Sequence, residues 1–368
     1  MRANSENRNS ELEKIIPRCK YFGKCGGCML QHLRYDEQIE LKKEKLKKLF
    51  NVVEIIPSPK IYEYRNRIDI VITDKGIGFR ERGKWWKIVD IDECLLFGKK
   101  SRLVLEKLRK FIKDFKLEPF NLRESKGFLR YVVLREGKFT NELMINLVTC
   151  KGKLPEEIEN YFGFADSLYW SINETKSDVS YGRPEKFWGK EYITEKLDNN
   201  RYLIHPNTFF QTNSYQTAKL IKIVEKFAEG SKILDLYCGV GTFAIYLARK
   251  GFKAMGIDNN QFAIKIAEKN AELNNVNALF QVCNDKDVGN LNYDTIVLDP
   301  PRQGLHPRLI KKLLKEKPKN IVYVSCNPYS LKDNIEKLSE IYRIENIIAL
   351  DMFPQTMHIE VVANLKLK

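Results

Sequence analysis

Hydrophobic and polar positions follow two different patterns along this chain of 368 residues. From about residue 62 to 150, apolar residues recur at every second position in short runs such as "RIDIVIT", "GIGFRER" and "ELMINLVT", with turn residues between them. This period of two predicts β-strands, and the short connections predict antiparallel hairpins. One stretch, "KSRLVLEKLRKFIKDF", has helical spacing instead and predicts a helix inserted among the strands.

The second pattern begins after the hydrophilic stretch "EKLDNNRYLIHPNTFFQTNSYQ", which we interpret as a domain junction. Beyond it, continuous apolar runs alternate with helical stretches, as in a doubly wound parallel sheet. The final "YRIENIIALDMFPQTMHIEVVANLKLK" holds two strand-like runs with no helix between them. The sequence therefore predicts an α/β fold with a C-terminal Rossmann-like domain that ends in an antiparallel hairpin, and a central antiparallel, β-rich α+β domain.

The length of the chain favours two domains over one. We place a disordered polar tail at residues 1–16, a central domain at 17–200 and the C-terminal domain at 201–368. Between the tail and the first hairpins, "DEQIELKKEKLKKLF" predicts an amphipathic helix. Its apolar stripe is expected to cover a core.

Charge points to the kind of partner. Lys and Arg outnumber Asp and Glu by 63 to 48, a formal net charge of +15 that favours RNA or DNA, although a Lys-rich thermophilic surface is an alternative. The polar amino terminus and the absence of any run of about 18 apolar residues predict a cytoplasmic protein that does not associate with membranes. A monomer is expected.

Basic and aromatic residues are interleaved on the polar faces of the predicted hairpins. They are Tyr64, Arg65, Arg67, Arg80, Arg82, Lys84, Trp85, Trp86, Lys87, Arg130 and Arg135. Positive charge for phosphates and flat rings for stacked bases are what single-stranded RNA requires. We therefore expect RNA contact here, with an ordinary solvated sheet face as the alternative.

A glycine turn marks a cofactor site. In "KILDLYCGVGTFAIYLARKG", Gly239 and Gly241 lie between a predicted strand and helix and allow the backbone to approach a ligand, while Asp258 ends the next strand, where it can bind ribose hydroxyls. The spacing also fits a dinucleotide fingerprint, so a flavin or nicotinamide oxidoreductase is an alternative. Asp235, just before the glycines, would repel phosphates and favours the cationic amino acid moiety of S-adenosylmethionine.

Three segments at predicted strand ends supply reactive groups: Asp299-Pro300-Pro301-Arg302, Ser325-Cys326-Asn327-Pro328 and His358-Ile359-Glu360. A thiolate that adds to carbon 6 of a pyrimidine makes carbon 5 nucleophilic, and a base must later remove the carbon 5 proton. We expect Cys326 to be that nucleophile and Glu360 that base, with Asp299 binding the uracil edge or the donor amine. Three other cysteines, Cys150, Cys238 and Cys283, are expected to be buried and structural.

Cysteines near the amino terminus form a candidate metal site. Cys19, Cys25 and Cys28 lie in "CKYFGKCGGC", and Cys94 in "DECLLF" can supply a fourth thiolate. Four thiolates suit either Zn²⁺ or an iron-sulfur cluster, and the spacing does not choose between them.

Seven ordered motifs, "CKYFGKCGGCMLQHL", "YRNRI", "FFQTN", "LDLYCGVGTFA", "LDPPRQG", "VSCNP" and "HIEVV", closely resemble the iron-sulfur-containing type of RNA 5-methyluridine methyltransferases. The resemblance implies a [4Fe-4S] cluster on the four cysteines, in a structural or RNA-positioning role. It also implies Cys326 as nucleophile and Glu360 as base. It further implies that four polar residues line the donor or uracil site: Gln211, Asp258, Asp285 and Asp299. Asn284 is an alternative to Asp285.

One departure from that family concerns the substrate. Many members carry a small OB-like RNA-binding domain before the first cluster cysteine, whereas 18 residues precede Cys19 here. This difference implies that the central region engages the RNA, and it favours 23S rRNA over tRNA without excluding tRNA. We thus expect an S-adenosylmethionine-dependent RNA uracil-C5 methyltransferase. The alternatives are an iron-sulfur oxidoreductase and a non-catalytic basic RNA-binding factor.

Overall fold

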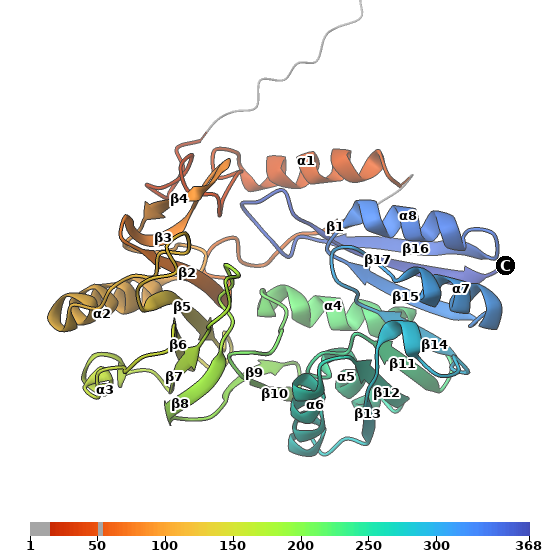
Figure 1. The fold of residues 1–368 in the computed structure, drawn as a ribbon. Helices are drawn as coiled ribbons and strands as arrows, with labels where there is room; N and C mark the ends of the chain where they lie inside the picture. Colours follow the sequence, from red (N-terminus) through yellow and green to blue (C-terminus); the bar gives the residue numbers. More distant parts are fainter. Residues whose placement is uncertain (1–14, 51–53) are drawn as a thin grey trace, which may run out of the picture.

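Two sheets stand beside each other in the computed structural model, which describes residues 15–50 and 54–368 (Figure 1). The expected disordered tail at 1–16 lies almost entirely outside the described residues. No helix among the described residues is long and apolar enough to span a bilayer. The larger sheet follows the order β1-β16-β17-β15-β14-β11-β12-β13, and the smaller one β4-β3-β2-β5-β6-β7-β8.

The larger sheet confirms the predicted doubly wound domain. Its strands are β1 (Glu54–Ile56), β11 (Lys232–Leu236), β12 (Lys253–Asp258), β13 (Ala278–Val282), β14 (Thr295–Leu298), β15 (Asn320–Ser325), β16 (Tyr342–Leu350) and β17 (Glu360–Leu367). All neighbours are parallel except β17, which is antiparallel to both β15 and β16 and so forms the expected terminal hairpin. Parallel strands direct their carboxyl ends to one edge, where ligands bind in such sheets.

Helices cover both faces of this sheet and bury its two apolar surfaces. Residues of α1 (Tyr35–Lys47), α7 (Pro307–Glu316) and α8 (Pro328–Leu338) share one core cluster with the strands, and residues of α4 (Ser214–Phe227), α5 (Thr242–Arg249) and α6 (Gln261–Leu273) share the other. A short 3₁₀ turn, η1 (Asp285–Asp287), follows β13. The central strands β11, β14, β15 and β17 are almost wholly buried on both faces, which explains their continuous apolar runs.

The smaller sheet differs from its prediction in one pairing. It consists of β2 (Arg67–Thr73), β3 (Gly76–Glu81), β4 (Lys84–Asp90), β5 (Leu129–Glu136), β6 (Leu143–Thr149), β7 (Ser167–Ile172) and β8 (Arg183–Gly189), with α2 (Lys99–Phe115) and α3 (Ile158–Phe162). Every pair is antiparallel except β6 and β7, which are parallel. The expected antiparallel pairing therefore holds for every pair of this sheet but β6 and β7, because the chain between these two strands crosses over through α3 instead of turning in a hairpin.

The stretch interpreted as a junction contains an ordered hairpin. Strands β9 (Ile193–Leu197) and β10 (Asn200–Ile204) pair antiparallel, and their apolar side chains are buried in the core beneath α4 and α5. The polar residues Asp198 and Asn199 form the tight turn between the two strands of this hairpin, where Asp198 has a φ of 53°.

The amino-terminal helix belongs to the larger sheet, although its residues precede the smaller one. Leu46 and Phe50 pack with α7 and α8, so α1 covers a core as predicted, and β1 pairs with β16 at the sheet edge. Lys42 of α1 donates to Asp351, with 2.5 Å between Nζ and Oδ1, and both side chains are 0% exposed. Tyr35 donates to the other carboxylate oxygen at 2.9 Å.

Replacing Lys42 by Met is expected to lower the free energy of unfolding by about 3–5 kcal/mol, because the Asp351 carboxylate would stay buried without its cation. Urea denaturation of the full chain measures this loss. In the double variant Lys42→Met/Asp351→Asn no charge is left unpaired, so most of the stability should return. A single variant as stable as the parent would contradict this role of the pair.

Candidate active site

A cavity of about 630 Å³ opens at the carboxyl edge of the larger sheet. Its wall includes seven of the residues singled out in the sequence: Gln211, Gly239, Asp258, Asp285, Asp299, Cys326 and Glu360. Most of them follow the ends of different strands, and Gln211 lies in the segment between β10 and α4. Glu360 starts β17, which runs the opposite way and therefore presents its first residue at the same edge. Asp235 and Gly241 are not part of this wall.

The thiol of Cys326 sits between the end of β15 and the start of α8. Asn327 caps that helix, since its side chain accepts from Tyr329 N at 3.2 Å. Partial positive charge at a helix amino terminus favours a thiolate. Burial acts the other way and, together with the nearby Glu360 and Asp299, raises the pKa of Cys326 to about 11, while Arg302 opposes this shift.

Two carboxyl groups share this desolvated corner. Glu360 is 2% exposed, and its Oε1 has no hydrogen-bond partner among the described residues. Burial and the neighbouring Asp299 raise the pKa of Glu360 well above its usual range. Burial also raises the pKa of Asp299 to about 7, although its Oδ2 accepts from Gln211 Nε2 at 2.9 Å. Buried groups with such pKa values are suited to proton transfer near neutral pH.

Arg302 and His358 were quoted in the sequence motifs but given no role. One guanidinium nitrogen of Arg302 lies 2.9 Å from His358 Nδ1. Burial and then Arg302 lower the pKa of His358, which keeps the imidazole neutral and able to accept this hydrogen bond. Arg302 also lowers the pKa of Cys326. A neutral histidine therefore holds a cation beside the thiol.

Alkylation of Cys326 by iodoacetamide is expected to rise about tenfold for each pH unit between pH 7 and pH 10, because only the thiolate reacts and the pKa of this thiol lies near 11. Mass spectrometry of the Cys326 peptide gives the rate. Arg302→Gln should slow alkylation at every pH in this range, since loss of the cation raises the thiol pKa further. A rate that levels off below pH 9 would contradict the assignment.

The opposite side of the cavity carries the predicted cofactor residues. Gly239 has a φ of 54°, and a Cβ there would meet open space, so the backbone is accessible to a ligand. Asp258 accepts from Gly239 N at 3.0 Å and from Asn260 N at 2.9 Å, which orients its carboxylate at the end of β12. Asp285 accepts from the Tyr237 hydroxyl at 2.7 Å.

Asp235 and Gly241 support this turn from behind. Asp235 is 0% exposed, and its Oδ2 accepts from Ala244 N at 3.0 Å, in the first turn of α5. The expected direct contact between Asp235 and a bound amino group therefore has no counterpart in the cavity wall. At Gly241, with a φ of 83°, a Cβ would lie 2.9 Å from the ring of Phe280, so this glycine serves close packing.

Several cavity residues were missed or misinterpreted in the sequence. Phe209, Tyr237 and Phe353 line the wall, and no periodicity distinguishes them from core aromatics. Cys283 was expected to be buried but is half-buried and lines the cavity, whereas Cys238 is buried as expected.

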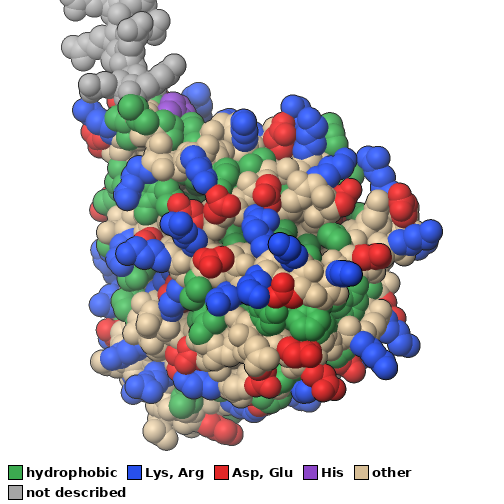
Figure 2. All heavy atoms as spheres, turned by 90° about the vertical axis from the view of Figure 1, so that its left-hand side faces the viewer, with side chains coloured by type: hydrophobic (Ala, Val, Ile, Leu, Met, Phe, Trp, Pro, Cys, Tyr) green, Lys and Arg blue, Asp and Glu red, His purple; other side chains and the backbone are tan. Residues whose placement is uncertain are grey.

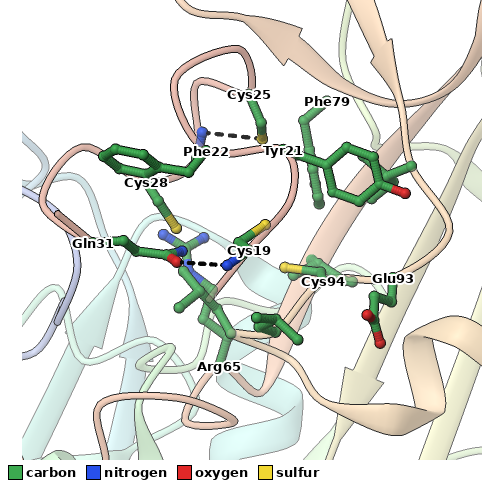
Figure 3. Close-up of a pocket in the computed structure, with 15 residues that line it drawn as sticks. Cys19, Tyr21, Phe22, Cys25, Cys28, Gln31, Arg65, Phe79, Glu93 and Cys94 are labelled. Atoms are coloured by element: carbon green, nitrogen blue, oxygen red, sulfur yellow. Dashed lines mark hydrogen bonds between the residues drawn. The ribbon is translucent and has the colours of Figure 1, made fainter. Parts of the chain in front are cut away.

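A second, smaller cavity of about 90 Å³ brings together Cys19, Cys25, Cys28 and Cys94 (Figure 3). Their side chains come from separate loop segments and surround a common space. Gln31 accepts from Cys19 N at 3.1 Å, and Gly27 N donates to the Cys25 sulfur at 3.4 Å. Within residues 15–50 and 54–368, no group of three or more Cys, His, Asp or Glu is arranged to hold a metal ion.

Arg65 also lines this cavity, beside the cysteines (Figure 3). Its Nε is buried and has no hydrogen-bond partner among the described residues. This position corrects the expectation that Arg65 contacts RNA. Three more of those expected contacts, Tyr64, Arg130 and Arg135, are also buried, so RNA contact through them was wrong.

Comparison with known proteins finds RNA methyltransferases among the relatives of this chain. Residues 279–368 match the model of the family described as tRNA (Uracil-5-)-methyltransferase, and residues 203–322 match the methyltransferase small domain. The tRNA (uracil(54)-C(5))-methyltransferase of Pyrococcus horikoshii is 60% identical over 353 residues, which are 96% of this chain and 86% of that protein. The 23S rRNA (uracil(747)-C(5))-methyltransferase of Pyrococcus abyssi is 44% identical over 98% of this chain and 89% of its own length.

A solved structure is similar over nearly the whole fold. The crystal structure of the Pyrococcus abyssi tRNA (uracil-54, C5)-methyltransferase in complex with S-adenosyl-L-homocysteine superposes with a TM-score of 0.86 at 57% identity, over 93% of this chain and 86% of that one. Identities of this size over this length are found only among proteins that share a family. The chain therefore belongs to the RNA (uracil-C5)-methyltransferases.

Proposed function

We propose that this protein transfers a methyl group from S-adenosylmethionine to carbon 5 of a uridine in tRNA. One observation carries the proposal: Cys326, Glu360 and Asp299 meet in one desolvated corner of a cavity whose opposite side is formed by Gly239 and Asp258. Family membership sets aside the oxidoreductase and the non-catalytic RNA-binding factor considered from the sequence.

The thiolate of Cys326 adds to carbon 6 of the uracil ring, and the ring electrons move onto oxygen 4 as an enolate. Bound S-adenosylmethionine supplies the methyl group that carbon 5 then takes up. Glu360 removes the proton from carbon 5, the carbon 5 to carbon 6 double bond returns, and the bond from carbon 6 to the Cys326 sulfur breaks. Arg302 stabilises the thiolate before addition and after release.

Gln211 and Asp299 are suited to hold the uracil edge. Their hydrogen bond, 2.9 Å from Gln211 Nε2 to Asp299 Oδ2, orients an amide beside a carboxyl group. With a pKa of about 7, Asp299 exists in both forms near neutral pH. Its carboxylate can accept from the N3 proton of uracil, and its protonated form can donate to oxygen 4.

Sequence identity favours tRNA over 23S rRNA, the substrate preferred in the sequence analysis. The relatives at 59–60% identity are named for uracil 54 of tRNA, whereas those named for uracil 747 of 23S rRNA reach 42–44%. The overall similarity therefore decides between the two substrates. 23S rRNA remains the second candidate.

A transfer assay with radiolabelled S-adenosylmethionine tests the substrate. The full chain should methylate an unmodified tRNA transcript at the uridine equivalent to position 54, and a transcript with cytidine there should gain no label. A 23S rRNA fragment that contains uridine 747 serves as the competitor. Preferential methylation of that fragment would overturn the choice of tRNA.

The smaller domain offers an RNA-binding surface. Trp85 and Trp86 at the start of β4 are 64% and 52% exposed, and they border a groove of about 310 Å³ together with Lys75 and Arg123. Lys and Arg side chains are spread widely over this side of the molecule, among fewer acidic ones (Figure 2). Exposed indoles suit stacking of unpaired bases, and the cations suit phosphates.

The cysteine cavity fits an iron-sulfur cluster, which we propose as its resident group. Four thiolates suit either a zinc ion or an iron-sulfur cluster, and the resemblance of the cysteine motif to the iron-sulfur-containing type favours the cluster. Four thiolates carry negative charge, and Arg65, whose Nε is buried without a hydrogen-bond partner among the described residues, supplies a cation at the same cavity. Cys19, Cys25, Cys28 and Cys94 would hold a [4Fe-4S] cluster in a structural role.

Anaerobic purification of the full chain is expected to yield about four iron and four sulfide per chain, with broad absorbance in the visible range. Cys94→Ser should lose most of this iron, whereas Cys150→Ser should retain it, because Cys150 lies outside the cavity. Zinc in place of iron after anaerobic purification would contradict the cluster.

A further inference from the structure

The loop between β16 and β17, residues 351–359, forms a strap across one side of the active site. The strap contributes Phe353 to the cavity wall, and the residue that follows the strap in the sequence is Glu360. Most of the strap is buried, with His358 as its exposed residue. The position of Glu360 therefore depends on how the strap is held.

The strap is fixed at its middle by the amino-terminal segment. Gln38 of α1 donates from Nε2 to Gln355 Oε1 at 3.0 Å and accepts from Gln355 N, also at 3.0 Å. Met29 N and Leu30 N both donate to Gln355 O, at 2.8 and 3.0 Å. Gln38 and Gln355 are 1% and 2% exposed, so water does not compete for these bonds.

Gln355 needs this support because its φ is 70°, in the left-handed region that side-chain-bearing residues avoid. Its N–H is held by Gln38, and its carbonyl by Met29 and Leu30. Strained residues persist where surrounding contacts over-determine them, and such residues cluster near functional sites.

We propose that Gln38 is a positioning residue that holds the strap, and with it Glu360, in the geometry needed for proton removal from carbon 5. This inference rests on the proposed function, in which Glu360 is the base. Cys326 and Asp299 follow β15 and β14, outside the strap, and the strap reaches the thiol through the bond between His358 and Arg302. Displacement of the strap should therefore impair proton removal by Glu360 more than addition of the thiol.

The same contacts link the active site to the cysteine cavity. Met29 and Leu30 lie between Cys28 and Gln31, both of which line that cavity. Gln31 in turn accepts from Cys19 N at 3.1 Å. The segment that carries the cysteines thus bonds directly to the residue that holds the strap.

The chemistry provides a way to separate positioning from general damage. In the methylated adduct, Glu360 takes the carbon 5 proton and the bond between carbon 6 and sulfur then breaks. A displaced carboxylate leaves that covalent adduct intact. With 5-fluorouridine in the RNA there is no proton on carbon 5, so the adduct accumulates even when Glu360 is in place.

The test uses Gln38→Ala and Gln38→Met in the full chain. On tRNA that contains uridine, both variants should lower kcat by about 10- to 100-fold and accumulate a protein-RNA adduct on denaturing gels. On 5-fluorouridine tRNA the rate of adduct formation should fall much less than the rate of turnover on uridine tRNA, because the thiol itself lies outside the strap. Asn146→Ala is the control. Asn146 is 1% exposed and accepts a hydrogen bond from Ser171 in the smaller sheet, so this variant also removes a buried hydrogen bond, but one away from the strap.

Glu360→Gln separates failure of this inference from failure of the proposed function. If Glu360→Gln accumulates the uridine adduct and the Gln38 variants do not, the positioning role is overturned. Adduct formation on 5-fluorouridine tRNA that is as slow as turnover would also overturn it. If Glu360→Gln itself accumulates no adduct, the proposed base is wrong. Hydrogen exchange then still decides the positioning role, which requires faster exchange at residues 351–360 in Gln38→Ala than in Asn146→Ala.

Discussion

Replacing Cys326 by Ala is expected to reduce methyl transfer by about 10⁴-fold or more, because the other thiol of the cavity wall, Cys283, follows β13 beside the predicted cofactor residue Asp285 and not the corner of Glu360 and Asp299. Radiolabel transfer to tRNA measures the loss. Binding of S-adenosylmethionine, followed by calorimetry, should stay close to that of the parent, because Gly239, Asp258 and Asp285 lie on other elements.

Two controls make this result specific to the thiol. Cys150→Ala removes another half-buried thiol, outside both cavities, and should retain activity. On 5-fluorouridine tRNA the parent should form a covalent adduct and Cys326→Ala none. Full turnover by Cys326→Ala would disprove covalent addition through this residue.

The second large loss of methyl transfer activity is expected for Glu360→Gln. This variant keeps the size of the side chain but cannot take up the carbon 5 proton, so kcat should fall by about 10²- to 10⁴-fold. Unlike Cys326→Ala, it should accumulate a methylated protein-RNA adduct that survives denaturing electrophoresis. Accumulation of free methylated RNA instead would show that another base acts.

The pH dependence of product release also follows from Glu360. Burial and Asp299 raise the pKa of Glu360, so its carboxylate form, which is the base, becomes scarcer as the pH falls. Single-turnover release of product by the parent should therefore slow toward acidic pH, while the adduct becomes more abundant. In Arg302→Gln the slowing of product release should begin at a higher pH than in the parent, because Arg302 lowers the pKa of Glu360.

That Asp299, Cys326 and Glu360 lie at one edge of the sheet could be predicted because these residues lie at strand ends. Asp299 follows β14 and Cys326 follows β15, and parallel strands bring such positions to one edge whatever the details of packing. Glu360 joined them because β17 could be identified as the second strand of a terminal hairpin. Asp235 lies on β11, but its side chain is enclosed beneath the first turn of α5. Alternation alone does not show which side of a strand faces the cavity.

Most of the wrong or missing predictions concern residues whose contact partners lie far away in the sequence. Arg65 was grouped with surface cations because it precedes an alternating strand, whereas it turns into the cysteine cavity. The parallel pairing of β6 and β7 requires α3, a helix too short to be recognised from periodicity. The contact of Gln38 with Gln355 joins residues 317 positions apart and leaves no local pattern.

The three-residue strand β1 has a consequence for how the chain must be made. Its partner β16 begins at Tyr342, on the far side of the smaller sheet in the sequence, so the hydrogen bonds between them cannot form until the chain has been synthesised through Leu350. Contacts of such long range slow folding. A fragment that starts after the smaller sheet would leave β16 with an unpaired edge, open to pairing with another chain, so we expect isolated catalytic fragments to aggregate.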